Sequence, residues 1–274
     1  MLLTLLGIHL RRPGRAVYSG SVIDVLERIG ISEQATRSTV SRMARRGLLH
    51  RFRSGRRAYL APTDRLRAVL EDGHRRIWQL SAVNRSWDGT WTLVGFSLPD
   101  TWNRQRHDLR SRLTWARFGM LHPGLWVAPG RVDATAVIDG LGLADYLTVM
   151  HGSPLPPTEA AHLVARGYDL TQLAADYKAF LDRWSDERRT PGSDAMTRQL
   201  LLHSEWLQLI RRDPHLPAEL LPGTWPAIGA EQLFHRLAIR YQPLAQEQAD
   251  RDLQIIVTSP AGATGEARQN AEPR

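Results

Sequence analysis

The first 62 residues carry short apolar groups separated by polar turns, a pattern that predicts three helices. Apolar residues over Leu2–Leu10 predict the first helix. The second is predicted after Ser21, an expected N-cap, because apolar residues then recur three and four positions apart as far as Gly30, an expected C-cap. Ser32 stands where it would cap a third helix over residues 33–46.

The third predicted helix has a narrow apolar stripe and a broad polar face. The inward stripe consists of Ala35, Val40, Met43 and Ala44. Two helices joined by a glycine turn, the second with a polar arginine face, are typical of a helix-turn-helix, whose second helix lies in the major groove of DNA. The candidates for contact with base edges are Gln34, Arg37, Ser38 and Arg42, and those for contact with phosphates are Ser41 and Arg45.

Residues 50–60 predict a β-hairpin with a basic tip. Extended segments over His50–Arg53 and Arg57–Leu60 flank a predicted turn at Ser54-Gly55. The arginines expected to project from it are Arg51, Arg53, Arg56 and Arg57. A hairpin beside a helix-turn-helix is a wing, which follows the phosphate backbone or enters the minor groove. The sequence therefore predicts a winged helix-turn-helix DNA-binding domain over residues 1–62.

Beyond residue 62 the pattern predicts a connecting helix over 63–86 and then a small domain over 87–152. The residues of the connecting helix expected to face inward are Leu66, Val69, Leu70, Ile77 and Leu80. In the small domain, strands over 92–98, 124–128 and 146–150 alternate with helices over 103–118 and 134–141. That order favours a ferredoxin-like α+β domain. Such domains often pair through their sheets, so a homodimer interface is expected here.

Residues 158–248 predict a helical domain, which follows a Pro-rich connection. Apolar and aromatic residues recur at helical spacing over 170–184, and further helices are predicted over 194–210 and 230–244. From 259 to 274 the chain is rich in Ala, Gly, Glu and Pro, which is typical of a disordered tail. The predicted fold class is α+β, with winged-helix, ferredoxin-like and helical parts in that order.

The basic residues are concentrated at the start of the chain. Residues 1–62 hold 12 arginines against Asp24, Glu27 and Glu33, a net charge of +9, whereas the remaining residues hold 24 basic and 25 acidic side chains. A segment so basic in an otherwise near-neutral protein indicates a polyanionic partner. Together with the helix-turn-helix pattern, it predicts binding to double-stranded operator DNA.

Composition argues against several other classes. The chain has no Cys, which removes disulfides, iron–sulfur clusters and thiolate zinc sites. No apolar run reaches the ~18 residues that would span a membrane, so no membrane partner is expected. Met1–Leu10 lacks the basic flank and the cleavage site of a signal peptide. The expected location is the cytoplasm, in association with the nucleoid.

Several motifs, in order along the chain, resemble the PaaX-type repressors of phenylacetic-acid degradation. The matching stretches are Gly30-Ile31-Ser32-Glu33, Ser41-Arg42, Arg45-Arg46-Gly47-Leu48, Trp87-Asp88-Gly89-Thr90-Trp91, Pro123-Gly124-Leu125-Trp126-Val127, Asp213-Pro214, Leu216-Pro217, Leu220-Leu221-Pro222 and Trp225-Pro226. The resemblance extends to about residue 250. It implies a winged-helix domain, a ferredoxin-like domain similar to a CRISPR adaptation nuclease, and a helical C-terminal domain. It also implies a repressor released from its operator by an aryl-acetyl-CoA thioester, such as phenylacetyl-CoA, as effector.

The effector site is not specified by the sequence. Trp126, Trp184, Trp206 and Trp225 are candidates for stacking on an aryl or adenine group in a pocket between the central and C-terminal domains. The pairs Arg188-Arg189 and Arg211-Arg212 are candidates for holding the phosphates of coenzyme A. Because tryptophans also anchor cores and paired arginines also complement helix dipoles, no effector-binding residue is assigned.

Enzymatic readings have less support in the sequence. A metal-dependent nuclease needs converging acidic residues, and the candidates are Asp100, after the first central strand, and Asp88, before it. His203, at an expected surface position, and His215 lack the spacing of metal ligands, and no G-x-S-x-G motif occurs. We expect no catalytic residue, metal or cofactor. The alternatives are a metal-dependent nuclease or acyl-CoA-handling enzyme built on the ferredoxin-like domain, and an architectural DNA-binding protein without a ligand.

Overall fold

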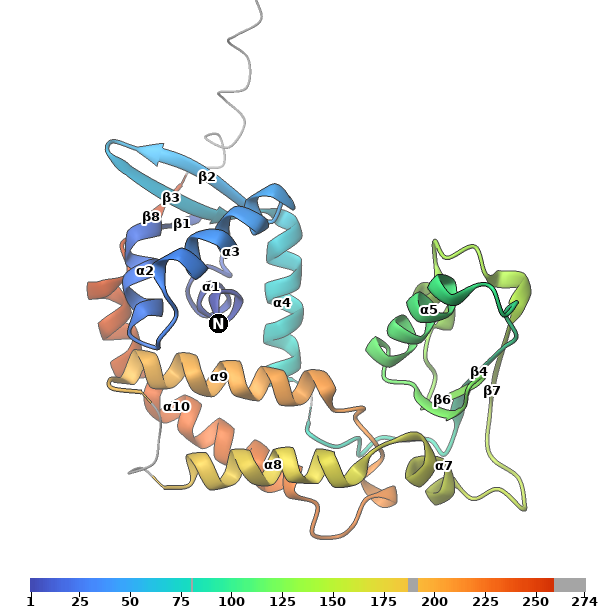
Figure 1. Cartoon of the computed structure of the whole chain (residues 1–274). Coiled ribbons are helices and arrows are strands. Elements are labelled where there is room, and N and C mark those ends of the chain that lie inside the picture. Colours follow the sequence, from blue (N-terminus) through green and yellow to red (C-terminus); the bar gives the residue numbers. More distant parts are fainter. Residues whose placement is uncertain (80, 187–191, 259–274) are drawn as a thin grey trace, which may run out of the picture. The chain divides into compact units, whose positions relative to one another are not determined.

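The computed structural model describes residues 1–79, 81–186 and 192–258 (Figure 1). Contacts within the chain divide it into two compact units, and neither unit is continuous in sequence. Unit 1 comprises residues 1–80, 183–207 and 234–274, and unit 2 comprises residues 81–182 and 208–233. The predicted disordered tail, Leu80 and Arg188-Arg189 lie outside the described residues.

Three helices are shared between the units, since the boundaries of the units fall inside them. They are α8 (Leu170–Trp184), α9 (Ala195–Arg212) and α10 (Pro226–Asp252). The other elements of unit 1 are α1 (Leu2–His9), β1 (Arg15–Tyr18), α2 (Ser19–Glu27), α3 (Glu33–Arg45), β2 (Leu49–Ser54), β3 (Arg57–Pro62), α4 (Asp64–Trp78) and β8 (Ile255–Val257).

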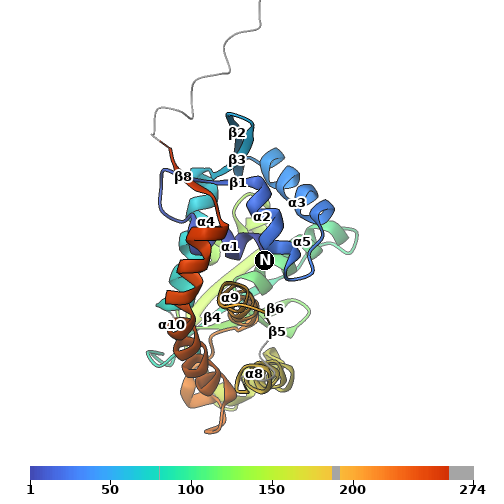
Figure 2. The same ribbon diagram turned by 90° about the vertical axis from the view of Figure 1, so that its left-hand side faces the viewer.

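The sheet of unit 1 joins the two ends of the chain. Its strand order is β2-β3-β1-β8, and all neighbours are antiparallel. Val17 of β1 lies opposite Leu60 of β3, and Ala16 lies opposite Ile256 of β8. Figure 2 shows α10 leading into β8 beside β1. The winged-helix sheet thus receives a strand from the C-terminal part of the chain.

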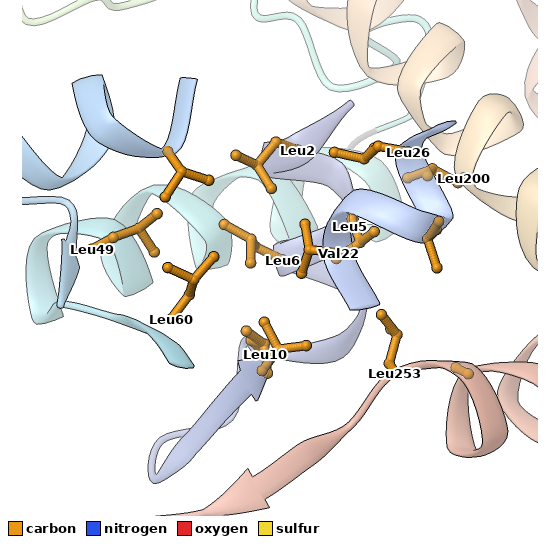
Figure 3. Packing of buried hydrophobic residues seen from close by; sticks show 14 of the residues in the cluster. Leu2, Leu5, Leu6, Leu10, Val22, Leu26, Leu49, Leu60, Leu200 and Leu253 are labelled. Carbon is orange, nitrogen blue, oxygen red and sulfur yellow. The ribbon is translucent and has the colours of Figure 1, made fainter. Parts of the chain in front are cut away.

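The core of unit 1 is built around α1, which is apolar on all sides and is buried accordingly. Leu5, Leu6 and Leu10 are almost fully buried, and Leu66 and Leu70 of α4 join them. Residues distant in sequence complete this core, namely Met196 and Leu200 of α9, Ala245 and Ala249 of α10, and Leu253. Figure 3 shows Leu200 and Leu253 beside Leu26 and Leu10. Because α4, α9 and α10 bury apolar side chains in this core, the core that supports the winged helix draws on residues well beyond residue 62.

Unit 2 contains a ferredoxin-like α+β sheet, as predicted. The elements of unit 2 that the boundaries leave whole are β4 (Trp91–Phe96), α5 (Asn103–Trp115), β5 (Gly119–His122), β6 (Leu125–Pro129), α6 (Ala134–Ile138), η1 (Ala144–Tyr146), β7 (Leu147–Gly152), α7 (Ala160–Gly167) and η2 (Ala218–Leu220). The antiparallel strand order is β5-β6-β4-β7. Helices α5 and α6 pack on Val94 and Trp126. Helix α7 packs through Val164 on Trp91 and Val127.

The strands β1, β5 and β8 were not predicted, because each has only three or four residues. Ser21, the predicted N-cap, is the third residue of α2, and the N-cap is Tyr18. The Ser21 hydroxyl donates to the carbonyl of Tyr18 (2.8 Å) and caps no amide of this helix. Val69, expected to face inward, is 43% exposed on α4. The helix predicted to end at residue 244 continues to Asp252, past Pro243, because Ala245 and Ala249 are buried in the core of unit 1.

Candidate nucleic-acid interface

The exposed face of α3 is fixed by the residues that this helix buries. Ser32 caps the helix, as predicted, with its hydroxyl accepting from the amide of Ala35 (3.3 Å). Thr36, Val40 and Met43 are buried against the core. Ala35 is exposed, so the prediction that it faces inward is wrong, and Thr36 takes its place.

The predicted DNA-contacting residues of α3 lie on the side away from this core. Gln34, Arg37, Ser38, Arg42 and Arg45 are exposed. Ser41, the sixth candidate, is half-buried. Positions three, four and seven apart share a helix face, so these side chains form a continuous polar surface.

Two arginines of this surface make contacts within α3. Nε and Nη2 of Arg37 each lie 2.6 Å from Oε1 of Glu33. Nη2 of Arg42 donates to the hydroxyl of Thr39 at 3.1 Å. Both arginines keep further N–H groups, because one guanidinium carries five donors. Glu33 therefore orients Arg37 without using all of its hydrogen-bonding capacity.

The hairpin of β2 and β3 forms the predicted wing. Ser54 pairs with Arg57, so the two-residue turn is Gly55-Arg56, one position later than predicted. Gly55 has a φ of +59°, the left-handed conformation that a tight hairpin turn requires. Phe52 stacks on Tyr59 across the strands, with ring centroids 5.9 Å apart. The wing lies next to α3 in both views (Figures 1 and 2).

The side chains of the wing differ in how they are held. The side chains of Arg53 and Arg56 are exposed and make no hydrogen bond or ion pair with the described residues. Nη1 of Arg57 donates to Oε1 of Gln254 at 2.6 Å, and its Cζ lies 5.4 Å from the centroid of the Tyr18 ring. Neither Tyr18 nor Gln254 was singled out from the sequence. The sequence signal that could have drawn attention to Gln254 is the run Ile255-Ile256-Val257 that follows it, because β-branched residues favour strands.

The enzymatic candidates are not assembled into a site. Asp100 is fully exposed, and its nearest described cation is Arg106 at 3.9 Å. Asp88 accepts from the amide and the hydroxyl of Thr90, which hold the pKa of its carboxyl below the ordinary value. Among the described residues, no three His, Asp or Glu side chains are grouped to hold a metal ion. No helix in the described ranges is both long and apolar enough to cross a membrane.

The tryptophans considered for an effector are all core residues. Trp126, Trp184, Trp206 and Trp225 are each at most 6% exposed. Trp184 donates to Glu205, and Trp206 stacks on Phe234 with centroids 4.9 Å apart. Arg211 and Arg212 are exposed in the last turn of α9, where cations complement the helix dipole.

His203 is buried, which contradicts its expected surface position. Its ring lies among those of Trp78 and Phe234, with centroids 5.9 and 5.3 Å away. Burial, with a smaller contribution from His74 and His9, lowers the pKa of His203 to about 4. Its Nε2 has no hydrogen-bond partner among the described residues. His203 therefore belongs to the apolar interior of unit 1 in its neutral form.

Comparison with known proteins matches three segments of the chain, in order, to one family. Residues 1–66 match the family "PaaX-like protein", residues 84–164 the "PaaX protein central Cas2-like domain", and residues 168–251 the "PaaX-like protein C-terminal domain". The chain is 28% identical over 257 residues to the transcriptional repressor PaaX of Escherichia coli (strain K12), covering 88% of this chain and 79% of that protein. It is also similar to the solved structure of an uncharacterised protein from Mycobacterium tuberculosis, with a TM-score of 0.63, 25% identity, and coverage of 90% and 95% of the two chains. With its three parts matched in order, this chain belongs to the PaaX family.

Proposed function

We propose that this protein is a DNA-binding transcriptional repressor whose interface is formed by α3 and the β2–β3 wing. The observation that carries the proposal is the exposed arginine surface of α3 beside a basic hairpin, within the segment that holds the charge excess. The similarity to the transcriptional repressor PaaX supports the same role. Repression by occupying an operator requires no catalytic step.

The two parts of the interface have different tasks in this proposal. Gln34, Arg37, Ser38 and Arg42 read base edges in the major groove, where arginine and glutamine can form bidentate hydrogen bonds. The phosphate-contacting group consists of Ser41, Arg45, Arg53, Arg56 and Arg57, which position the protein without reading sequence. The sequence preference therefore comes from α3, and much of the salt dependence comes from the wing.

Substitution of Arg37 tests the base-reading role. The operator is first isolated by selecting bound duplexes from a random pool, and affinities for it and for a random duplex are then compared. Arg37→Ala is expected to weaken the free energy of binding by on the order of 1–3 kcal/mol for the selected duplex and by little for random DNA. Arg104→Ala is the matched control, because this arginine is 92% exposed on α5 of unit 2. Equal losses on both duplexes would assign Arg37 to phosphate, and no binding by the wild type would refute the repressor function.

The repressor is proposed to act as a homodimer through the central sheet. Strand β7 is an outer strand of that sheet and, in the described part of the chain, pairs with β4 alone. Val149 and Met150 on this strand are 46% and 58% exposed. An outer strand with exposed apolar side chains is a surface on which a second chain can pair. Two winged helices related by a two-fold axis would then read a palindromic operator.

Light scattering during size-exclusion chromatography tests the dimer. Val149→Lys is expected to convert a dimer into a monomer, because each chain would bring a positive charge to the strand that pairs. Val69→Lys, at a similarly exposed valine (43%) on α4, is the control and should leave the mass unchanged. A monomeric wild type, or a dimer that persists in the β7 variant, would contradict this arrangement.

Release by an aryl-acetyl-CoA thioester such as phenylacetyl-CoA rests on the family resemblance. By linkage, an effector that weakens DNA binding must itself bind more weakly to the DNA complex by the same factor. Thermal shift with phenylacetyl-CoA, acetyl-CoA and free coenzyme A tests the class, since a ligand of the folded state raises the melting temperature. No shift with any of the three would remove the acyl-CoA effector from the proposal. A repressor of this kind works in the cytoplasm, on nucleoid DNA.

A further inference from the structure

The segment Asp252–Val257 at the end of α10 is fixed in the sheet that carries the wing. Strand β8 lies antiparallel to β1, and the amide of Tyr18 donates to the carbonyl of Gln254 at 2.9 Å. The amide of Thr258 donates to the carbonyl of Gly14 at 2.8 Å. Nη1 of Arg28 lies 2.5 Å from Oδ2 of Asp252, which ties the last residue of α10 to the end of α2. The main chain of Gln254 is therefore held in place independently of its side chain.

The side chain of Gln254 reaches Arg57, the first residue of β3. The Nη1–Oε1 distance is 2.6 Å although the two residues are 197 positions apart. The guanidinium also lies over Tyr18, with 5.4 Å between Cζ and the ring centroid. Tyr18 packs in turn against Tyr59, with centroids 6.1 Å apart. Arg57 is thus restrained on two sides, whereas Arg53 and Arg56 nearby have no such contacts with the described residues.

An amide is well suited to hold an arginine that must remain available to phosphate. The Gln254 oxygen occupies one of the five donors of the guanidinium and leaves its full positive charge. A free arginine loses rotamer entropy when it is immobilised on DNA, and a restrained one loses less. A carboxylate at position 254 would form an ion pair and neutralise the charge before DNA arrives.

We propose that the segment Asp252–Val257 is part of the DNA-binding surface, and that Gln254 is a positioning residue that holds wing Arg57 toward the phosphate backbone. This inference rests on the proposed function, because it requires that the wing contacts DNA. It adds a residue from the far end of the chain to a surface that the sequence confined to residues 1–62.

The test measures the affinity of the full-length protein for a random duplex of about 30 base pairs between about 50 and 200 mM salt. Arg57→Ala should weaken binding and lower the salt slope by about 0.9, the value for one phosphate contact. Gln254→Ala should weaken binding roughly two- to tenfold, the loss of one hydrogen bond, with an unchanged slope. Gln254→Glu should lower the slope by about one, because Arg57 is then already paired.

A double substitution separates positioning from a general structural effect. In an Arg57→Ala background, Gln254→Ala should cause no further loss. The matched controls are Gln246→Ala and Gln246→Glu, because this exposed glutamine of α10 bonds Asp250 (2.7 Å) and not the wing. Both controls should bind as the wild type does.

The contrary outcomes are distinct. If the Gln254 variants bind like the wild type while Arg57→Ala is weakened, the positioning role is wrong. If Gln254→Ala weakens binding equally with and without Arg57, its effect is structural and the inference is also overturned. If Arg57→Ala itself binds normally, Arg57 does not contact DNA and Gln254 has nothing to position, although the repressor function stands. If the wild type binds no duplex, the proposed function fails as well.

Discussion

Leu253 offers a direct test of whether the C-terminal part of the chain completes the winged-helix unit. This side chain is 3% exposed and belongs to the same core as Leu10 and Val22 (Figure 3). Leu253→Ala removes three carbon atoms, which at about 0.8 kcal/mol per buried CH2 group corresponds to about 2.4 kcal/mol. The remaining cavity adds to this, so the free energy of unfolding should fall by about 3 kcal/mol.

Urea unfolding and amide hydrogen exchange measure this effect. The amide of Tyr18, which donates to the carbonyl of Gln254, should exchange roughly a hundredfold faster in Leu253→Ala, as a 3 kcal/mol loss implies. Leu244→Ala on α10, nine positions earlier, is the control, because this side chain is 58% exposed and should change stability by at most about 0.5 kcal/mol. A loss below about 1 kcal/mol for Leu253→Ala, or equal losses in the two variants, would refute the placement of this residue in the core.

Three further substitutions test other parts of the molecule. Arg56→Ala should weaken binding to selected and random duplexes alike and lower the salt slope by about 0.9, whereas a loss confined to one sequence would mean that the wing reads bases. Since burial lowers the pKa of His203 to about 4, the unfolded chain takes up the proton first as pH falls below 6.5, and stability is lost from there down to about pH 4. At pH 5 the loss in the free energy of unfolding is about 2 kcal/mol relative to pH 7. In urea unfolding at several pH values, His203→Gln should lack this loss. The same pH dependence in the wild type and the variant would contradict a neutral buried ring. Tyr177→Phe should lower the free energy of unfolding by about 2 kcal/mol, because the Tyr177 hydroxyl donates to buried Asp213 at 2.5 Å. A loss as small as that of Tyr146→Phe, at an exposed tyrosine, would show that this hydrogen bond is not stabilising.

Helix α3 and the β2–β3 wing could be predicted because their signals are local. The cap at Ser32 and the helical spacing of Val40 and Met43 lie within a dozen residues, and the wing needs only a glycine turn between two short strands. The alternation of strands and helices in residues 87–152 likewise gave the ferredoxin-like fold. Its strand β5 was missed because four residues carry too little periodicity.

The parts that escaped prediction depend on contacts between distant residues. Nothing near Arg57 indicates that its acceptor is Gln254, and nothing near His203 indicates that Trp78 covers it. Pro243 is a helix-breaking signal, and it was outweighed by burial of the alanines that follow it. Tertiary packing therefore determines where α10 ends, and with it which residues make up the core of unit 1.

The dependence of the wing sheet on β8 has a consequence for biosynthesis. Domains generally fold in order as they leave the ribosome, starting from the N-terminus. Here the first strand to emerge, β1, must wait for residues 255–257 before both of its edges are paired. A nascent chain, or one cut short by a premature stop codon before residue 255, contains the arginines of α3 but lacks strand β8. One edge of β1 then stays unpaired. The four-stranded sheet that carries the wing can therefore form only after residue 257 has been translated.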